Sequence, residues 1–113
     1  MRDGIPVVRP LRKSEYPVLF VSKSVEKNWR ELVATRRDKV VDAWETLTMF
    51  PCVSTELNYE LRNGIGSIVK SGVAYPLWQL KLDKRDGARI WYFMSDGKVY
   101  IEEVFTAHPN QTK

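Results

Sequence analysis

Lys81 and Arg89 are the side chains best placed for chemistry, because each lies in a segment whose residue pattern is typical of a β-strand. If residues 83–87 form the loop between these strands, Lys81 stands directly opposite Arg89 across the sheet. Trp91 shares the face of Arg89, because side chains two residues apart on a strand point the same way. Two cations beside an aromatic ring can hold a phosphate and stack a nucleic-acid base. The pattern therefore predicts a surface that binds polyanions.

His108 is the single histidine of the chain, and it continues the parity of that face beyond the last expected strand. The ordinary pKa of a histidine, about 6.5, suits it to transfer protons near neutral pH. His108 is therefore the leading candidate for a general acid or base, against the alternative of a plain surface histidine.

The basic residues are clustered, although the net charge is only +4, with 18 Lys and Arg against 14 Asp and Glu. The clusters fall in residues 1–13, 23–39 and 81–89. Clustered bases favour a polyanionic partner such as RNA, because neutralising phosphates releases counterions. The alternative is a solvated helix face with pairs such as Glu26–Arg30. On the first interpretation, the later clusters supply these candidate RNA contacts: Arg36, Arg37, Lys84 and Arg85.

Length and composition exclude several classes of protein. A chain of 113 residues fits one domain and is too short for a two-domain enzyme with its own dinucleotide fold. One cysteine, Cys52, and one histidine exclude a zinc finger and most other zinc sites. No apolar run approaches the roughly 20 residues that span a bilayer, and the N-terminus lacks a secretory signal. We therefore expect a cytoplasmic protein that is not bound to a membrane.

We expect a loose arm over residues 1–16 and a single domain over residues 17–113. In that domain, an apolar segment at 18–21 predicts a strand, and Ser22 or Ser24 can cap the following helix. A second helix should follow almost directly and end at Phe50, which gives an antiparallel helical hairpin. Residues 52–76 are expected to be a long connection with one short element near 57–62. Three further strands are expected at 77–82, 88–94 and 98–106.

The expected order is thus β-α-α-β-β-β, an α+β domain in which an antiparallel sheet packs on an N-terminal helical hairpin. Asp96-Gly97 predicts a two-residue turn between the last two strands. Pairing outward from this turn sets Phe93 opposite Tyr100, Trp91 opposite Glu102 and Arg89 opposite Val104. This register puts Phe105 on the core face, with Glu103 as an exception there, and Tyr100 beside Trp91 on the other face. A one-residue bulge would change the pairing, and the second face can also be ordinary solvent-exposed surface.

Three segments carry a family likeness: the strand LWQLKL, the hairpin ARIWYFMSDGKVYIEEV and the ending FTAHPNQTK. In these segments and in its element order, the chain resembles the RelE/ParE superfamily, the toxins of bacterial type II toxin–antitoxin systems. The resemblance covers roughly residues 18–113 and leaves the arm outside the pattern. It implies a RelE-like fold and a cognate antitoxin protein as partner.

The resemblance to RelE toxins implies an endoribonuclease that cuts mRNA on the ribosome and so inhibits translation. The implied chemistry needs no metal or other cofactor: the ribose 2′-OH attacks the adjacent phosphate and leaves a 2′,3′-cyclic phosphate and a 5′-hydroxyl. Such a step needs a base, a cation for the charged phosphorane and an acid for the leaving oxygen.

The resemblance also implies roles for individual residues. Arg89 matches the family's phosphate-binding arginine, and His108 matches the position of a catalytic His or Tyr. Lys81 lies near basic residues that other members use. Glu60 and Arg62 lie where some members carry a Glu-then-Lys segment. Trp91 and Tyr100 would contact RNA from the same face.

Two departures from the family pattern leave other functions open. No tyrosine follows Tyr100, and Glu102 adds negative charge beside the expected phosphate site. The alternatives are a ParE-like inhibitor of DNA gyrase and a non-toxic homologue that acts as a binding module.

Overall fold

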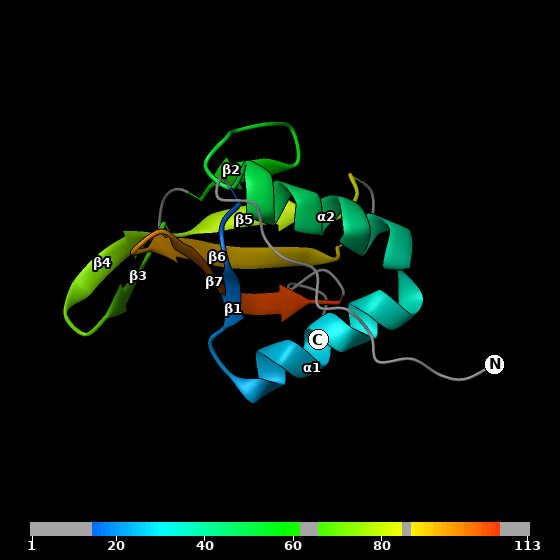
Figure 1. The fold of residues 1–113 in the computed structure, drawn as a ribbon, viewed down its shortest axis with the longest axis horizontal. Helices are drawn as coiled ribbons and strands as arrows, with labels where there is room; N and C mark the ends of the chain where they lie inside the picture. The colour runs from blue at the N-terminus through cyan, green and yellow to red at the C-terminus, as the bar shows by residue number, and fades with distance from the viewer. Residues whose placement is uncertain (1–14, 62–65, 85–86, 107–113) are drawn as a thin grey trace.

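The computed structural model describes residues 15–61, 66–84 and 87–106 (Figure 1). Within these ranges the fold is α+β, with two helices and seven strands. The elements in chain order are β1 (Val18–Phe20), α1 (Lys23–Thr35), α2 (Arg37–Met49), β2 (Asn58–Glu60), β3 (Ser67–Lys70), β4 (Val73–Pro76), β5 (Trp78–Lys81), β6 (Arg89–Ser95) and β7 (Lys98–Phe105). None of the helices in this part of the chain is long and apolar enough to cross a membrane.

The main sheet has five strands in the order β1-β7-β6-β5-β2. Neighbouring strands are antiparallel in the part of this sheet made by β7, β6, β5 and β2, but β1 runs parallel to β7. The sheet is therefore mixed, and the expectation of an antiparallel sheet was wrong for its first strand. Parallel neighbours need a crossover between them, and here the whole chain between β1 and β7, both helices included, provides it.

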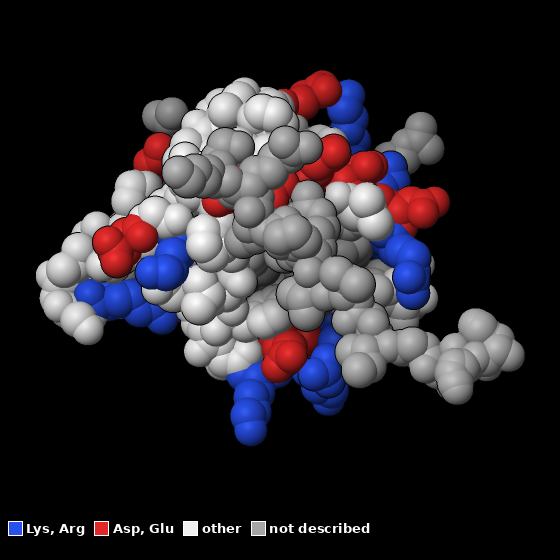
Figure 2. Space-filling view, in the orientation of Figure 1, with Lys and Arg blue, Asp and Glu red and all other residues white. Residues whose placement is uncertain are grey.

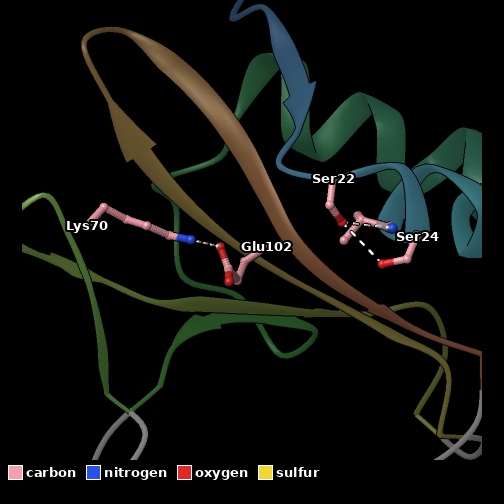
Figure 3. Close-up of polar contacts among 5 residues, drawn as sticks. Ser22, Ser24, Lys70 and Glu102 are labelled. Atoms are coloured by element: carbon pink, nitrogen blue, oxygen red, sulfur yellow. Dashed lines mark hydrogen bonds and ion pairs between the residues drawn. The ribbon is translucent and has the colours of Figure 1, made fainter.

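α1 begins where the sequence predicted. The Ser22 hydroxyl accepts a hydrogen bond from the backbone N–H of Val25 at 3.3 Å, which satisfies one donor of the first helical turn (Figure 3). Val25 and Leu32 are buried, and they recur on one helical face. Packing of this face on the sheet therefore fixes the orientation of α1.

Arg36 alone separates α1 from α2 and caps both helices. Figure 1 shows the two helices spreading apart from this junction. The Trp29 and Trp44 rings meet edge to face between them, with centroids 6.1 Å apart. Because the helices spread apart, a space opens between them, and these large aromatic side chains fill it.

The core lies between the helices and one face of the main sheet. Its buried residues are Val25, Leu32, Val40, Ala43, Leu47, Leu80, Leu82, Ala88, Ile90, Tyr92, Val99, Ile101 and Val104. The Tyr92 hydroxyl lies 2.7 Å from the Pro51 carbonyl oxygen and 2.5 Å from Asn58 Oδ1, and it can donate its proton to either. Burial raises the pKa of Tyr92, so the hydroxyl remains a donor that ties the segment after α2 to the sheet.

Residues 52–76 were predicted to be a long connection with one short element, but the described part of this segment holds three strands. β2 confirms the short element near 57–62, but β3 and β4 then form a separate two-stranded sheet. Ser71 and Gly72 make its turn with φ of 51° and 80°. A Ser-Gly turn between two alternating segments was the signal for this hairpin.

The β6–β7 pairing follows the predicted register only as far as Tyr92. Phe93 lies opposite Tyr100 as expected, but the register then shifts by one residue, so Trp91 lies opposite Glu103. Arg89 accordingly faces Phe105, not Val104. A bulge adds one residue to β7, so the side chains beyond it change faces. Val104 is buried in the core as a result, and Phe105 lies on the opposite face.

Tyr16 and Glu15, which fell in the predicted arm, belong to the described part of the chain. Glu15 is buried, and Tyr16 packs against the core. The Tyr16 N–H also donates to the Thr48 carbonyl at 2.8 Å. The domain therefore begins by residue 15, and the rest of the predicted arm lies outside the described residues.

Candidate functional site

The face of the main sheet that points away from the helices gathers polar, charged and aromatic side chains. We call it the outer face. Its residues are Tyr59, Gln79, Lys81, Arg89, Trp91, Phe93, Tyr100, Glu102, Glu103 and Phe105. It is made by four strands, because cross-strand partners on β2, β5, β6 and β7 point to the same side.

Gln79 is the centre of a hydrogen-bond network on the outer face, and it is only 5% exposed. Its Oε1 accepts from Arg89 Nη1 at 3.2 Å and from Trp91 Nε1 at 2.8 Å. Its Nε2 donates to the Tyr59 hydroxyl at 2.9 Å. One amide thus orients three side chains that could contact a ligand.

Arg89 is held by a second contact, in which its Nε donates to the Gly87 carbonyl at 3.1 Å. Its Nη2 nitrogen has no partner within the described residues, so those N–H groups can bind a ligand. A guanidinium fixed on one side and open on the other is suited to a phosphate oxygen.

Lys81 lies directly opposite Arg89, as the sequence predicted. Its Nζ is 6.0 Å from the centre of the Tyr59 ring. Like charges facing each other across strands destabilise a sheet, and the aromatic ring offsets only part of this cost. A bound anion would relieve the remaining repulsion.

Sequence reasoning missed Tyr59 as a site residue and left Gln79 without a role. The pattern of Leu57 to Leu61 is that of a short strand, but nothing local indicates that this strand pairs with β5. The Tyr59 contact with Gln79 joins residues 20 positions apart. Only the sheet order brings them together.

A hollow of about 380 Å³ lies on the outer face beside Trp91. Its lining residues are Ser67, Ile68, Leu77, Trp91, Glu102, Glu103 and Phe105. We call it the carboxylate hollow. Trp91 and Phe105 meet edge to face there, with ring centroids 4.8 Å apart. The bulge in β7 creates the hollow, because it turns both Phe105 and the second of two adjacent glutamates toward this side.

The two carboxylates of the hollow have different surroundings. Lys70 Nζ lies 3.1 Å from Glu102 Oε1, an ion pair that reaches from β3 to β7 (Figure 3). This oxygen is buried and accepts no hydrogen bond. Burial, and then the neighbouring Glu102, raise the pKa of Glu103. The hollow thus holds one carboxylate paired with Lys70 and a second, Glu103, that makes no ion pair within the described residues.

Glu60 does not join Lys81 and Arg89, contrary to the sequence prediction. It pairs with Trp78, whose side chain packs against the core, so Glu60 belongs to the helix side of the sheet. Its neighbour Tyr59 takes the position on the outer face. Alternation along β2 therefore separates Glu60 from the cations.

The predicted RNA contacts outside the sheet are dispersed. Arg36 and Arg37 lie at the helix junction, and Lys84 forms an exposed ion pair with Glu56 at 2.9 Å. Figure 2 shows basic and acidic side chains mixed along the rim of the view. These residues do not extend the outer face.

Tyr100 and Trp91 both lie on the outer face, as predicted, but in different surroundings. Tyr100 stacks on Phe93 with centroids 5.3 Å apart, near the β6–β7 turn. Trp91 lies between Arg89 and the carboxylate hollow. Of the two, Trp91 is the one next to the cations.

Three predicted site residues, Arg62, Arg85 and His108, lie outside the described residues. In the part of the chain that is described, no group of three or more His, Cys, Asp and Glu side chains could hold a metal ion.

Comparisons with protein-family models, with curated proteins and with solved structures found no match to this chain. Its function has therefore to be inferred from the outer face.

Proposed function

We propose that the chain is a cytoplasmic, RelE-like toxin of a type II toxin–antitoxin system that cleaves mRNA on the ribosome. The observation that supports this function most is the pairing of Lys81 with Arg89 on the outer face. Two cations held side by side against their own repulsion favour an anionic substrate. The antitoxin partner and the ribosome follow from the family resemblance alone.

The pair can stabilise the step in which charge develops on phosphorus. When the ribose 2′-oxygen bonds to phosphorus and the bond to the 5′-oxygen breaks, negative charge accumulates on the phosphorane. Arg89, oriented by Gln79 and Gly87, and the adjacent Lys81 would bind these oxygens. Orientation before the reaction matters, because no energy is then lost in reorganising the donors.

Two proton transfers complete the reaction: one from the 2′-hydroxyl and one to the 5′-oxygen. His108 is the proposed group for one of them, on the strength of its residue type. Tyr59 is a further proton donor on the outer face, since its oxygen accepts from Gln79 and leaves its own O–H available.

Binding without cleavage is the second candidate function. Glu102 and Glu103 lie on the same face as the cations. Their negative charge would oppose the extra charge of a phosphorane more than that of a resting phosphodiester. This arrangement favours a protein that holds RNA without cutting it.

Expression in a bacterial host tests these functions. We expect the unaltered chain to stop growth and incorporation of labelled amino acids, with new 5′-hydroxyl ends on mRNA. Arg89→Ala should reduce cleavage by about 10²–10³-fold, as for the loss of one donor to a charged transition state. Arg89→Lys should rescue little, because it lacks the planar fork. Lys27→Ala, an exposed cation on α1, is the matched control.

The outcomes separate the candidates. Harmless expression together with RNA binding would favour the binding module. Growth arrest with continuing translation and loss of DNA supercoiling would point to gyrase. Unchanged toxicity in both Arg89→Ala and Lys81→Ala would overturn the assigned site.

A further inference from the structure

We infer that the carboxylate hollow is a base-recognition pocket that selects guanine in a bound RNA strand. The inference rests on the proposed function, because it places the base of a strand whose phosphate contacts Lys81 and Arg89. The phosphate contacts of the proposed function do not distinguish one RNA sequence from another, and the pocket would supply that preference.

The hollow lies at the right place for such a base. Trp91 lines the hollow and lies two residues from Arg89 on β6, about 7 Å along the strand. Phe105, another lining residue, is directly opposite Arg89. A phosphate at Arg89 would thus bring an adjoining base to the mouth of the hollow.

The walls of the hollow suit the flat faces of a base. Trp91 and Phe105 form one side, and their edge-to-face contact fixes both rings. Trp91 is held further by its hydrogen bond to Gln79. Ile68 and Leu77 add apolar surface. RNA-binding proteins recognise unpaired bases by stacking on aromatic side chains such as these.

The carboxylates determine which base fits. The Watson–Crick edge of guanine presents two adjacent donors, N1–H and the N2 amino group, which match the two oxygens of a carboxylate. Adenine and cytosine present one amino group beside a ring nitrogen that accepts, and uracil presents one N–H between two carbonyls. A carboxylate repels these acceptors, so guanine alone makes both bonds.

Glu103 is the residue that would bind this edge. It makes no ion pair or hydrogen bond within the described ranges, whereas Glu102 is held by Lys70. The buried oxygen of Glu102 already faces Lys70, so Glu103 is the carboxylate of the hollow left for a base. An organic cation would also suit carboxylates and aromatic rings. However, Lys81 and Arg89 lie on the same face, and their positive charge favours a neutral base on an anionic strand.

Binding of short RNAs to the full chain tests the inference. The probes are fluorescent pentamers with 2′-O-methyl riboses, which block 2′-OH attack: UUGUU, UUAUU, UUCUU, UUUUU and UUIUU, where I is inosine. We expect UUGUU to bind about tenfold more tightly than UUUUU. Inosine lacks the N2 amino group and should lose most of that advantage. Because the probe changes and the protein does not, this comparison is independent of folding.

Glu103→Gln should bind UUGUU no more tightly than the same variant binds UUUUU. Glu45→Gln, which removes a charge from the exposed side of α2, should keep the guanine preference. Circular dichroism checks that both variants fold.

Equal affinity for all five RNAs would overturn the guanine pocket and leave the proposed RNA-binding function intact. If none of the five RNAs binds, the guanine pocket and the binding-module function are both overturned, whereas cleavage on the ribosome is tested separately by expression of the chain and of Arg89→Ala. Equal affinity for all five RNAs, together with binding of agmatine that Glu103→Gln abolishes, would show that the hollow binds organic cations instead.

Discussion

At the scale of single residues, Glu103 shows how one extra residue in a strand can change the pKa of a side chain. The bulge places its carboxylate partly out of water and beside Glu102, and burial and then the neighbouring charge raise its pKa. The folded chain therefore binds a proton at Glu103 more readily than the unfolded chain does. By linkage, Glu103 lowers the free energy of unfolding as pH rises from about 4.5 through its raised pKa.

Glu103→Gln should accordingly stabilise the protein at pH 7 by less than about 1 kcal/mol, since solvent screens a half-exposed group. The gain should shrink toward zero as the pH falls to about 4, where the glutamate is protonated in both states. Urea unfolding at pH 4 and pH 7 measures it, with Glu45→Gln as control. A variant less stable than the parent at pH 7 would mean that the carboxylate makes a favourable contact instead.

The residue-level predictions that the structure confirms depend on local rules. The pairing of Lys81 with Arg89 could be predicted by counting residues, because the strand patterns on both sides of the loop are clear in the sequence. Gln79 shares the face of Lys81 by simple alternation along β5, but its hydrogen bonds to Tyr59, Arg89 and Trp91 span three strands. No local pattern specifies such a network, because its geometry depends on the strand order.

At the scale of elements, the sequence marks the β6–β7 turn clearly but gives no sign of the bulge in β7. Asp96-Gly97 gave the β6–β7 turn, and both residues have positive φ, at 56° and 75°. The bulge farther along the same pair has no comparable signature, since Glu102, Glu103 and Val104 fit a regular strand as well as a bulged one. The bulge keeps the Glu103 carboxylate out of the core, where a regular strand would place it, and puts Val104 there instead.

Gly97→Ala should destabilise the protein by about 1 kcal/mol, through backbone conformation alone. A Cβ at this position would meet nothing within 4 Å, but φ of +75° is costly for alanine. Chemical denaturation measures the change. Gly97→Asn is the matched control and should cost less, because asparagine tolerates the left-handed region. Equal losses in the two variants would show that the turn depends on more than its backbone angles.

At the scale of the whole molecule, charge supports a local site over a general polyanion-binding surface. Most of the basic residues fall in three clusters, and acidic side chains lie between the bases on the face shown in Figure 2. Several cations are already paired, such as Arg30 with Glu26 and Lys39 with Asp83. Counting charges along the sequence locates the clusters, but only the fold shows that Lys81 and Arg89 face away from the helix junction.

RNA binding should therefore depend weakly on salt. If Lys81 and Arg89 neutralise two phosphates, the plot of log affinity against log salt for a single strand should have a slope of about −1.4. Lys81→Ala should reduce the slope to about −0.7, and Lys27→Ala should leave it unchanged. Titrations of UUUUU between low and physiological salt measure it. A much steeper slope, reduced by Arg37→Ala, would mean that the helix junction also grips the strand and that RNA binds across both sides of the molecule.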